Sequence, residues 1–310
     1  MSSQPSGLSI VIPSYRRGQI VLDTIRYLLD LPEPPLEILI VDQTEEHPAE
    51  ILAGFQALEN GIVRRIALPE PSIPRAMNVG LQESKGGIVL FLDDDIIPDK
   101  NLVFNHRKAH ADFPEAAAVV GQVLQPEDGF QVSAEEKRKS ARGLRNDLEF
   151  RFNSAEPVWI HNVMAGNLSV KRTPALRAGG FDENFIPPVS FRFETEFAKR
   201  LIAVCGRIRF EPAASICHLR AGQGGTRSRG SHLTSVSPTH GVGDYYYALR
   251  CGSGWCRFVY MLKRPFREVR TRFHLIHPWY IPVKFVGELR AMMMAFRLYK
   301  KGPQLILWKE

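Results

Sequence analysis

The amino-acid sequence predicts an α/β fold: a mostly parallel sheet with helices on both faces, followed by a helical, basic C-terminal extension. Short continuous apolar runs alternate with helix-length amphipathic segments over residues 8–93, which is typical of parallel strands covered on both faces. Polar and acidic residues directly follow these runs, at the strand ends where sheets of this kind bind ligands. A composition of 44% hydrophobic and 24% charged residues is that of a globular chain, neither disordered nor fibrous.

The apolar runs and the segments between them place the elements in order. Four strands are predicted at residues 8–13, 36–42, 62–69 and 87–93. Apolar residues recur at helical spacing between these strands, which predicts helices at residues 19–31, 48–58 and 73–83. Farther along, residues 134–150 are highly charged and indicate a surface helix or an insertion, and a helix is expected near residues 194–204. Residues 220–243 are rich in Gly, Ser, Thr and Arg, which favours a mobile loop before a helical C-terminal region.

The positive charge of the chain is concentrated near its C-terminal end. Residues 250–310 contain 13 Lys and Arg against three acidic residues, a balance of +10, whereas the whole chain has a net charge of +7. The other residues therefore carry 27 bases and 30 acids, a balance of −3. This distribution excludes a uniformly basic nucleic-acid-binding protein, and no nucleic-acid partner is expected.

Aromatic residues are interleaved with the cations of residues 250–310. This combination suits an anionic membrane surface, where each nearby cation contributes about 1 kcal/mol. A water-exposed helical face whose aromatics fold into a local core explains the same pattern, and periodicity does not separate the two interpretations. Charged residues interrupt the apolar stretch at residues 277–299, so it is not expected to span a membrane. Because the N-terminal residues do not resemble a signal sequence, we expect a cytoplasmic protein, peripheral on the inner face of the cell membrane in the first interpretation.

Three consecutive carboxylates, Asp93, Asp94 and Asp95, follow the fourth predicted strand. So much negative charge at a strand end is costly without a cation, and carboxylate oxygens are ligands that Mg²⁺ and Mn²⁺ prefer. On an extended backbone Asp93 and Asp95 point to the same side. The alternative is a cap for a helix that starts near Asp99, but a cap needs a single acid. The sequence therefore predicts a divalent-metal site here.

Three further residues are candidates for contacts with a nucleotide. Asp42 ends the second predicted strand, where it either caps the next helix or accepts hydrogen bonds from a base or a ribose. Arg75 and Asn78 are three residues apart and share a helical face. An arginine in this position either holds a diphosphate or is an ordinary surface cation.

The order of these motifs resembles that of the family-2 glycosyltransferases with the GT-A fold. The donor-binding half of that family is similar to IVIPSYRR, LEILIVDQ, IPRAMNVGL and FLDDDIIPD in this chain. The resemblance continues through AGNLSVKRTPALRAGGFDENF, RFETEFAKRLIAVCGRIRFEP and ASICHLR, and it covers about residues 8–220. It implies a GT-A-like mixed, mostly parallel sheet. It also implies the inverting transfer of a sugar from a nucleoside-diphosphate sugar to an acceptor hydroxyl, with Mn²⁺ or Mg²⁺ as cofactor.

The same resemblance implies how the chain is divided and what it acts on. Residues 1–220 form the glycosyltransferase domain, with a nucleotide-sugar-binding half at 8–125 and an acceptor and catalytic half at 155–220. The loop at 221–243 and the basic, aromatic-rich helical region at 244–310 follow. A UDP-sugar is the commonest donor for such a protein, with dTDP- and GDP-sugars as alternatives. A glycan or a lipid-linked acceptor, in polysaccharide or lipid-linked glycan synthesis, is expected.

The donor-site residues of the family are carried over to the matching positions of this chain. Asp93 and Asp95 are the implied DxD pair, with Asp95 the direct metal ligand, and His218 matches a histidine that reaches the metal or the diphosphate. The residues implied to bind the nucleotide sugar are Pro13, Tyr15, Arg16, Asp42, Arg75, Asn78, Asp93, Asp94, Asn167 and Arg227. The residues after Asp42 depart from the family pattern, so the nucleotide base stays open.

Glu194 occupies the position that the resemblance assigns to the catalytic base. The family usually has Glu-Asp before the x-Glu-Phe-x-x-Arg-Leu helix, whereas this chain has Phe193 and Glu194. A glutamate performs the same proton transfer with a slightly longer reach, and Asp182 is the alternative base. His218, and Arg227 or Arg229 of the predicted loop, are expected to stabilise the leaving group.

Other classes of function fit less of the sequence. A nicotinamide-dependent dehydrogenase would have GxGxxG after the first strand, where this chain has PSYRRG. A nucleotidyltransferase on a related sheet would have a glycine-rich phosphate loop at the same place. A non-catalytic protein that binds nucleotide sugars or membrane surfaces would not need the acidic cluster together with Glu194.

Overall fold

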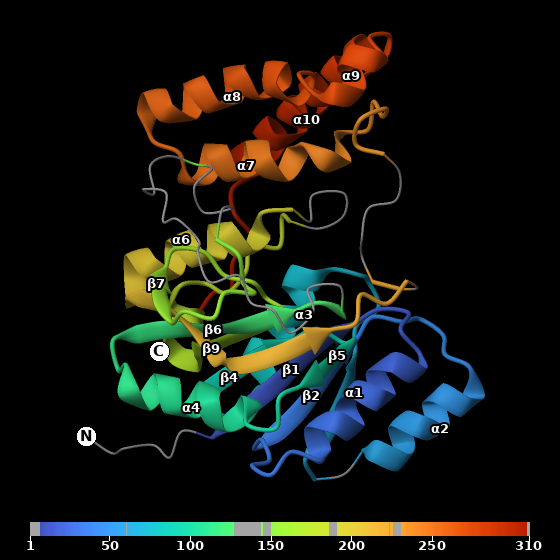
Figure 1. The fold of residues 1–310 in the computed structure, drawn as a ribbon, viewed down its shortest axis with the longest axis vertical. Helices are drawn as coiled ribbons and strands as arrows, with labels where there is room; N and C mark the ends of the chain where they lie inside the picture. Colours follow the sequence, from blue (N-terminus) through green and yellow to red (C-terminus); the bar gives the residue numbers. More distant parts are fainter. Residues whose placement is uncertain are drawn as a thin grey trace.

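One continuous sheet extends through the first two-thirds of the chain (Figure 1). A computed structural model describes residues 7–59, 61–126, 144, 150–185, 191–222, 224–225 and 231–308. In these residues the sheet has nine strands in the order β3-β2-β1-β4-β8-β6-β9-β5, and β7 pairs with β9. Residues 134–143 and 145–149 of the predicted charged helix or insertion lie outside the described residues.

The first four strands form at the predicted apolar runs and pair in parallel. They are β1 (Leu8–Ser14), β2 (Glu37–Asp42), β3 (Val63–Ala67) and β4 (Ile88–Leu92). The helices between them are α1 (Gln19–Leu29), α2 (Ala49–Leu58) and α3 (Ile73–Glu83). All residues of β2 and β4 are buried, which explains their unbroken apolar sequences.

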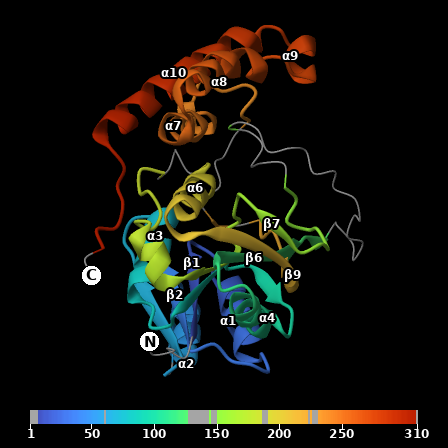
Figure 2. The ribbon, with the colours of Figure 1, turned by 90° about the vertical axis from the view of Figure 1, so that its left-hand side faces the viewer.

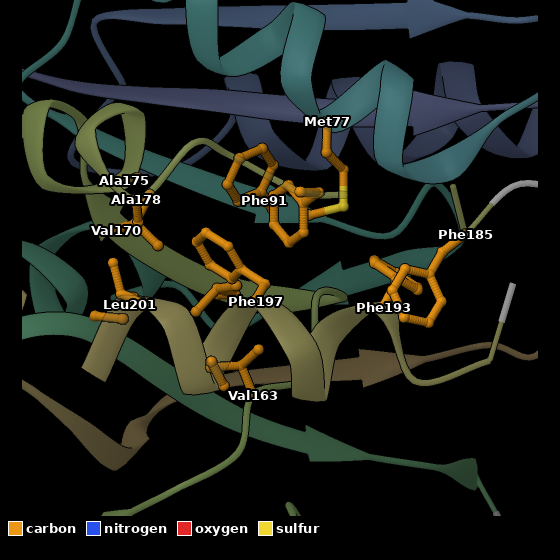
Figure 3. Packing of buried hydrophobic residues seen from close by; sticks show 14 of the residues in the cluster. Met77, Phe91, Val163, Val170, Ala175, Ala178, Phe185, Phe193, Phe197 and Leu201 are labelled. Atoms are coloured by element: carbon orange, nitrogen blue, oxygen red, sulfur yellow. The ribbon is translucent and has the colours of Figure 1, made fainter. Parts of the chain in front are cut away.

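Alternate residues of these strands pack on opposite faces of the sheet. Ile10 and Ile40 belong to the core that α1 and α2 cover, whereas Val11 and Val41 belong to the core that α3 covers. Figure 3 shows part of this second core, where Met77 of α3 and Phe91 of β4 lie close together. The prediction of helices on both faces is therefore confirmed.

The rest of the sheet is mixed in direction, as the resemblance implies. β8 (Asn167–Lys171) lies antiparallel between β4 and β6 (Ala116–Leu124). β9 (Arg207–His218) is parallel to β6 and antiparallel to both β5 (Ile96–Pro98) and β7 (Val158–Ile160). The helices of this part are α4 (Leu102–Asp112), α5 (Arg172–Arg177) and α6 (Phe193–Cys205). The two expected halves of the domain thus share one sheet.

The C-terminal region is helical, as predicted, and its helices gather at one end of the molecule (Figures 1 and 2). They are α7 (Val242–Cys251), α8 (Gly254–Glu268), α9 (Arg272–Ile276) and α10 (Tyr280–Lys301), after the short 3-10 helix η3 (Pro238–His240). Beyond α10 the chain returns to the sheet domain, where the Ile306 N–H donates to Gly179 O at 2.8 Å. Among the described residues, no helix is both long and apolar enough to cross a membrane.

A buried network of ion pairs ties the C-terminal helices to the start of α6. Asp244 of α7 pairs with Arg192 at 2.9 Å and with Arg264 of α8 at 3.0 Å. Arg264 also pairs with Glu288 of α10 at 2.5 Å, and Glu288 pairs with Lys284 at 2.9 Å. Burial alone would raise the pKa of Asp244, but the two guanidinium groups outweigh it and hold that pKa below its usual value. Arg192 has a left-handed φ of 78° and directly precedes α6, so this network fixes the point where the helix begins.

Replacing Asp244 by alanine is expected to lower the free energy of unfolding by about 3–5 kcal/mol, because the guanidinium groups of Arg192 and Arg264 stay buried without a counter-charge. Urea unfolding followed by circular dichroism measures this change. Asp112→Ala is a matched control, since its pair with Lys108 is exposed and is expected to contribute less than about 1 kcal/mol. Equal losses in the two variants would contradict a structural role for the buried network.

Candidate active site

The acidic cluster lies at the carboxyl end of the central, fully buried strand β4. Asp93, Asp94 and Asp95 connect β4 to the short strand β5. β5 pairs with the end of β9, where Ile96 is opposite His218. This pairing brings the histidine, more than a hundred residues away in the chain, next to the three carboxylates.

Asp93, Asp95 and His218 form a group that fits a divalent metal ion. Their candidate ligand atoms all lie within 4.8 Å of one another. His218 Nε2 lies 3.1 Å from Asp95 Oδ1 and 3.6 Å from Asp93 Oδ2. Asp95 Oδ1 is buried and accepts no well-aligned hydrogen bond from the part of the chain that the structure describes. Two carboxylates and one imidazole are a donor set for Mn²⁺ or Mg²⁺, with the carboxylate oxygens the preferred ligands.

The environment of Asp95 keeps its carboxylate charged. Burial raises the pKa of Asp95, but His218, the Ala221 N–H at 2.7 Å and the Arg17 guanidinium outweigh burial, so the pKa is lower than usual. Asp93 differs because about half of its side chain is exposed. The candidate metal site therefore combines the buried carboxylate of Asp95, which the protein holds in place, with the carboxylate of Asp93, which is exposed to solvent.

Asp94, which is predicted to bind the nucleotide sugar, has partners inside the protein. Its carboxylate accepts a hydrogen bond from Ser14 Oγ at 2.8 Å and lies 3.0 Å from Arg17 Nε. Burial raises the pKa of Asp94 to about 7, although the Arg17 charge opposes this shift. Asp94 thus holds the loop after β1 in place.

Arg17 is a site residue that the sequence reasoning missed. Besides Asp94, it approaches Asp95 Oδ2 at 3.5 Å, and its Nη1 donates to Ala221 O at 3.1 Å. It therefore offsets part of the negative charge of the acidic cluster. In the sequence, Arg17 is simply the second of two arginines after Tyr15. The first of them, Arg16, is the one that the resemblance implies to bind the nucleotide sugar.

Glu194 lies in the first turn of α6 and faces the same site. Its Oε1 accepts a hydrogen bond from the Ala165 N–H at 2.5 Å. The next residue, Gly166, accepts a hydrogen bond from the Asp93 N–H at 3.2 Å, and a Cβ at Gly166 would lie 2.2 Å from Asp93 Oδ2. A side chain at position 166 would displace the Asp93 carboxylate, so the two carboxylates approach the same pair of residues. Phe193 anchors the helix beside Glu194 because its ring is buried in the core (Figure 3).

The pKa of Glu194 is suited to proton transfer near neutral pH. Burial raises it, the Ala165 hydrogen bond opposes this, and the negative charge of Asp93 raises it further, to about 7. A carboxylate with a pKa near the working pH is an effective general base.

The carboxylate of Asp182, the alternative base, accepts three hydrogen bonds inside the protein. It is fully buried, and its oxygens accept hydrogen bonds from Asn184 N at 3.0 Å, Gln304 N at 2.9 Å and Tyr246 Oη at 2.7 Å. Asp182 thus joins the loop after α5 to α7 and to the returning C-terminal segment, and its role as the alternative base stays a prediction.

Asn78 and Asn167, which are predicted to contact the donor, form hydrogen bonds inside the protein. Asn78 donates to Phe181 O at 2.8 Å and accepts from Phe181 N at 2.7 Å. Asn167 donates to Gln122 O at 3.0 Å, and its Oδ1 lies 2.8 Å from His106 Nε2. Both side chains are completely buried.

Asp42 lies at the end of β2 beside the end of β1, as expected for a nucleoside pocket, but its carboxylate already has partners. Its Oδ2 lies 2.6 Å from His47 Nε2 and 3.1 Å from Arg65 Nε, and its Oδ1 accepts from Thr44 N at 3.0 Å. A base or a ribose that donates a hydrogen bond to Asp42 would therefore share this carboxylate with His47, Arg65 and Thr44.

Five other residues are predicted to bind the nucleotide sugar; the structure describes four of them, and the fifth lies outside the described residues. Pro13 and Tyr15 are partly buried at the end of β1, and the Arg16 guanidinium lies 5.1 Å above the Tyr15 ring. Arg75 is half-exposed, and its ion pair with Glu70 is at the surface. Arg227 lies outside the described residues.

The fold of this chain is similar to that of solved glycosyltransferases. The mannosyltransferase PcManGT from Pyrobaculum calidifontis, in complex with GDP-Man and Mn²⁺, matches 97% of this chain and 80% of its own, with a TM-score of 0.56 and 18% identity. GalNAc-T7, with UDP, GalNAc and Mn²⁺, matches 96% of this chain and 57% of its own, with a TM-score of 0.61 and 16% identity. At these identities the likeness shows the GT-A-like fold.

Two curated relatives match by sequence. "Probable glycosyltransferase YdaM" of Bacillus subtilis (strain 168) is 25% identical over 219 residues, which are 67% of this chain and 49% of the relative. Glycosyltransferase GlyG of Streptococcus pneumoniae serotype 4 (strain ATCC BAA-334 / TIGR4) is 24% identical over 97 residues, 31% of this chain and 32% of the relative. The chain thus spans about half of the first relative and about a third of the second.

The family model for "Glycosyl transferase family 2" matches residues 9–175, which is more than half of the chain. This segment contains the acidic cluster and the Ala165–Gly166 contact that joins it to Glu194. On this match, together with the fold, the chain belongs to glycosyl transferase family 2.

Proposed function

We propose that the protein transfers a sugar from a nucleoside-diphosphate sugar to an acceptor hydroxyl, with inversion at the anomeric carbon and with Glu194 as the general base. The observation that carries this proposal is that Glu194 and Asp93 contact neighbouring residues. Glu194 accepts a hydrogen bond from the Ala165 N–H, and the Asp93 carboxylate lies against Gly166. A proton acceptor and a metal-binding carboxylate then lie on the two sides of one reaction space.

In the proposed reaction, the Glu194 carboxylate takes the proton of the acceptor hydroxyl as that oxygen forms a bond with the anomeric carbon. The bond from the anomeric carbon to the diphosphate oxygen breaks on the opposite side, and the nucleoside diphosphate leaves. A divalent cation held by Asp93, Asp95 and His218 would supply positive charge where this negative charge develops. Among the described residues, the ion-pair partner of Arg75 is the exposed Glu70, so the Arg75 guanidinium would be able to turn toward the diphosphate.

Glu194 as the base predicts an acidic limb in the pH profile. Its carboxyl, with a pKa raised to about 7, must be deprotonated to act, so kcat/KM falls by about tenfold for each pH unit below this pKa. A bound cation favours the carboxylate, so the limb should move to lower pH as Mn²⁺ is raised. Initial rates across the pH range, each after a check that the protein stays folded, measure this. A flat profile through neutral and mildly acidic pH would contradict the assignment.

The donor is proposed to be a UDP-sugar, with GDP- and dTDP-sugars as alternatives. The two solved neighbours hold GDP-Man with Mn²⁺ and UDP with Mn²⁺, so both contain a nucleoside-diphosphate group and the same metal ion. Thermal unfolding with UDP, GDP and dTDP, each with and without Mn²⁺, distinguishes them, because a ligand that binds the folded state raises its melting temperature. The matching nucleotide should raise it only when Mn²⁺ is present.

The acceptor is proposed to be a growing glycan or a lipid-linked glycan. The excess of cations and aromatics in residues 250–310 supports a location on the inner face of the cell membrane, where lipid-linked acceptors are found. A nucleotidyltransferase would instead join a nucleotide to its substrate. Mass analysis of the product separates the two, since only sugar transfer releases the whole nucleoside diphosphate.

A further inference from the structure

The outward face of α8 is apolar along its length. Trp255, Phe258, Leu262 and Phe266 are between 51% and 74% exposed. Their spacing of three or four residues places them on one side of the helix. The other side is packed inside the protein, where Arg264 joins the buried ion-pair network. A continuous exposed apolar stripe of this kind marks an interaction surface.

Exposed apolar side chains are also present on α9 and α10 and in the turn between them. Leu275, Ile276 and Trp279, around the turn between these helices, are 80%, 68% and 62% exposed. A second exposed stripe at helical spacing on α10 consists of Val286, Leu289, Met293 and Phe296. All of these residues belong to the helices at one end of the molecule, away from α1 and α2 (Figures 1 and 2). We call the exposed apolar residues named in this paragraph and the preceding one the apolar cap.

Exposed cations lie on the same helices as the apolar cap or between them. Residues 254–301 contain 11 Lys and Arg but only two acids, Glu268 and Glu288. Among the described residues, seven of these cations are exposed and have no acidic partner: Lys263, Arg270, Arg272, Arg290, Arg297, Lys300 and Lys301. An exposed surface that combines aromatics with so many unbalanced cations complements an anionic, partly apolar partner.

A hollow on α10 combines the two features on a smaller scale. Its volume is about 540 Å³, and it is lined by three cations, Arg290, Arg297 and Lys301, together with apolar residues that include Met293 and Leu298. The cations would meet a phosphate, and the methionine and leucine side chains would meet the adjoining acyl chains. This chemistry is that of a phospholipid at its headgroup.

We propose that the apolar cap docks on an anionic phospholipid bilayer, with its aromatics in the interface and its cations on the phosphates. A second copy of this chain is a poor occupant, because two caps would bring fourteen unpaired cations together. The inference deepens the proposed membrane location and rests on it, but it does not depend on sugar transfer. Since the ion-pair network ties these helices to the start of α6, docking would hold the active site close to a lipid-linked acceptor.

Flotation of the purified full chain with vesicles tests this proposal. The protein is expected to float with vesicles of phosphatidylcholine and phosphatidylglycerol at low salt, and far less with phosphatidylcholine alone or at high salt. The variant R290Q/R297Q/K301Q should lower the partition coefficient by about two orders of magnitude, since each cation near an anionic surface contributes about fivefold. The variant W255S/F258S should weaken binding while keeping its dependence on salt.

The variant R26Q/R107Q/K108Q is the matched control, because it removes three exposed cations from α1 and α4 and changes the net charge equally. Its vesicle binding should stay within about twofold of the unmodified chain. The proposal would be overturned if the protein did not float with the anionic vesicles at low salt. It would also be overturned if the control variant lost as much vesicle binding as R290Q/R297Q/K301Q. Stabilisation by nucleotide and Mn²⁺, measured on the same variants, should be unchanged, so that failure of docking is distinguishable from failure of the proposed chemistry.

Discussion

Replacing Asp95 by asparagine is expected to lower the rate of sugar transfer by about 10²- to 10³-fold, the usual cost of removing one group that stabilises charge in the transition state. The buried carboxylate of Asp95 is the ligand that the protein holds most firmly, with His218 at 3.1 Å and the Ala221 N–H at 2.7 Å. Asparagine keeps the shape but loses the charge. Initial rates over a range of Mn²⁺ concentrations should show both a lower maximum and a higher requirement for Mn²⁺.

Asp99→Asn provides the control for this variant. Asp99 follows β5, four residues after Asp95, but it is exposed, and its carboxylate accepts a hydrogen bond from Asn101 N at 2.8 Å. Its replacement is expected to leave the rate within about twofold, as for most surface substitutions. If Asp95→Asn had a normal rate and a normal Mn²⁺ requirement, the metal site would be assigned wrongly.

Replacing Glu194 by glutamine is expected to lower kcat by about 10²- to 10⁴-fold, the range that general base catalysis contributes. The amide oxygen of glutamine still accepts the hydrogen bond from the Ala165 N–H, so the loop and donor binding should be preserved. Single-turnover rates and the dissociation constant of the nucleotide, measured on one preparation, separate these effects. Glu194→Asp should recover part of the activity because it restores a proton acceptor.

Asp182→Asn tests the alternative base. Replacing the Asp182 carboxylate should lower the free energy of unfolding by about 1–3 kcal/mol, because the buried donors around it lose their charged acceptor. The rate per folded molecule should fall by less than about tenfold. If this variant lost as much activity as Glu194→Gln while remaining folded, the assignment of the base would have to be reversed.

Much of the fold could be predicted from the sequence because it depends on local patterns. The run at residues 36–42 predicts β2, which extends over Glu37–Asp42, since burial on both faces requires an unbroken apolar strand. The antiparallel strand β8 was not predicted. Its sequence NLSVK is short, and its strand conformation depends on β4 and β6, whose residues are far away in the chain.

The same distinction holds for the site. Asp93, Asp95, His218 and Glu194 were named from motifs, and the structure brings them together. Asn78 and Asp182 look equally suited to a ligand in the sequence, yet their hydrogen bonds go to Phe181 and Gln304, which are 103 and 122 residues away. The sequence shows that a residue near a ligand-binding edge is polar, but not whether its side chain contacts the ligand or a distant part of the chain. Only the tertiary structure separates the two cases.

Calorimetric titration of UDP and GDP into the protein, with and without Mn²⁺, tests the central claim most directly. The claim is that a cation on Asp93, Asp95 and His218 binds the diphosphate beside Glu194. It predicts nucleotide binding that requires Mn²⁺, is lost in Asp95→Asn and is retained in Glu194→Gln. Equal nucleotide affinity with and without Mn²⁺, or full affinity in Asp95→Asn, would contradict it.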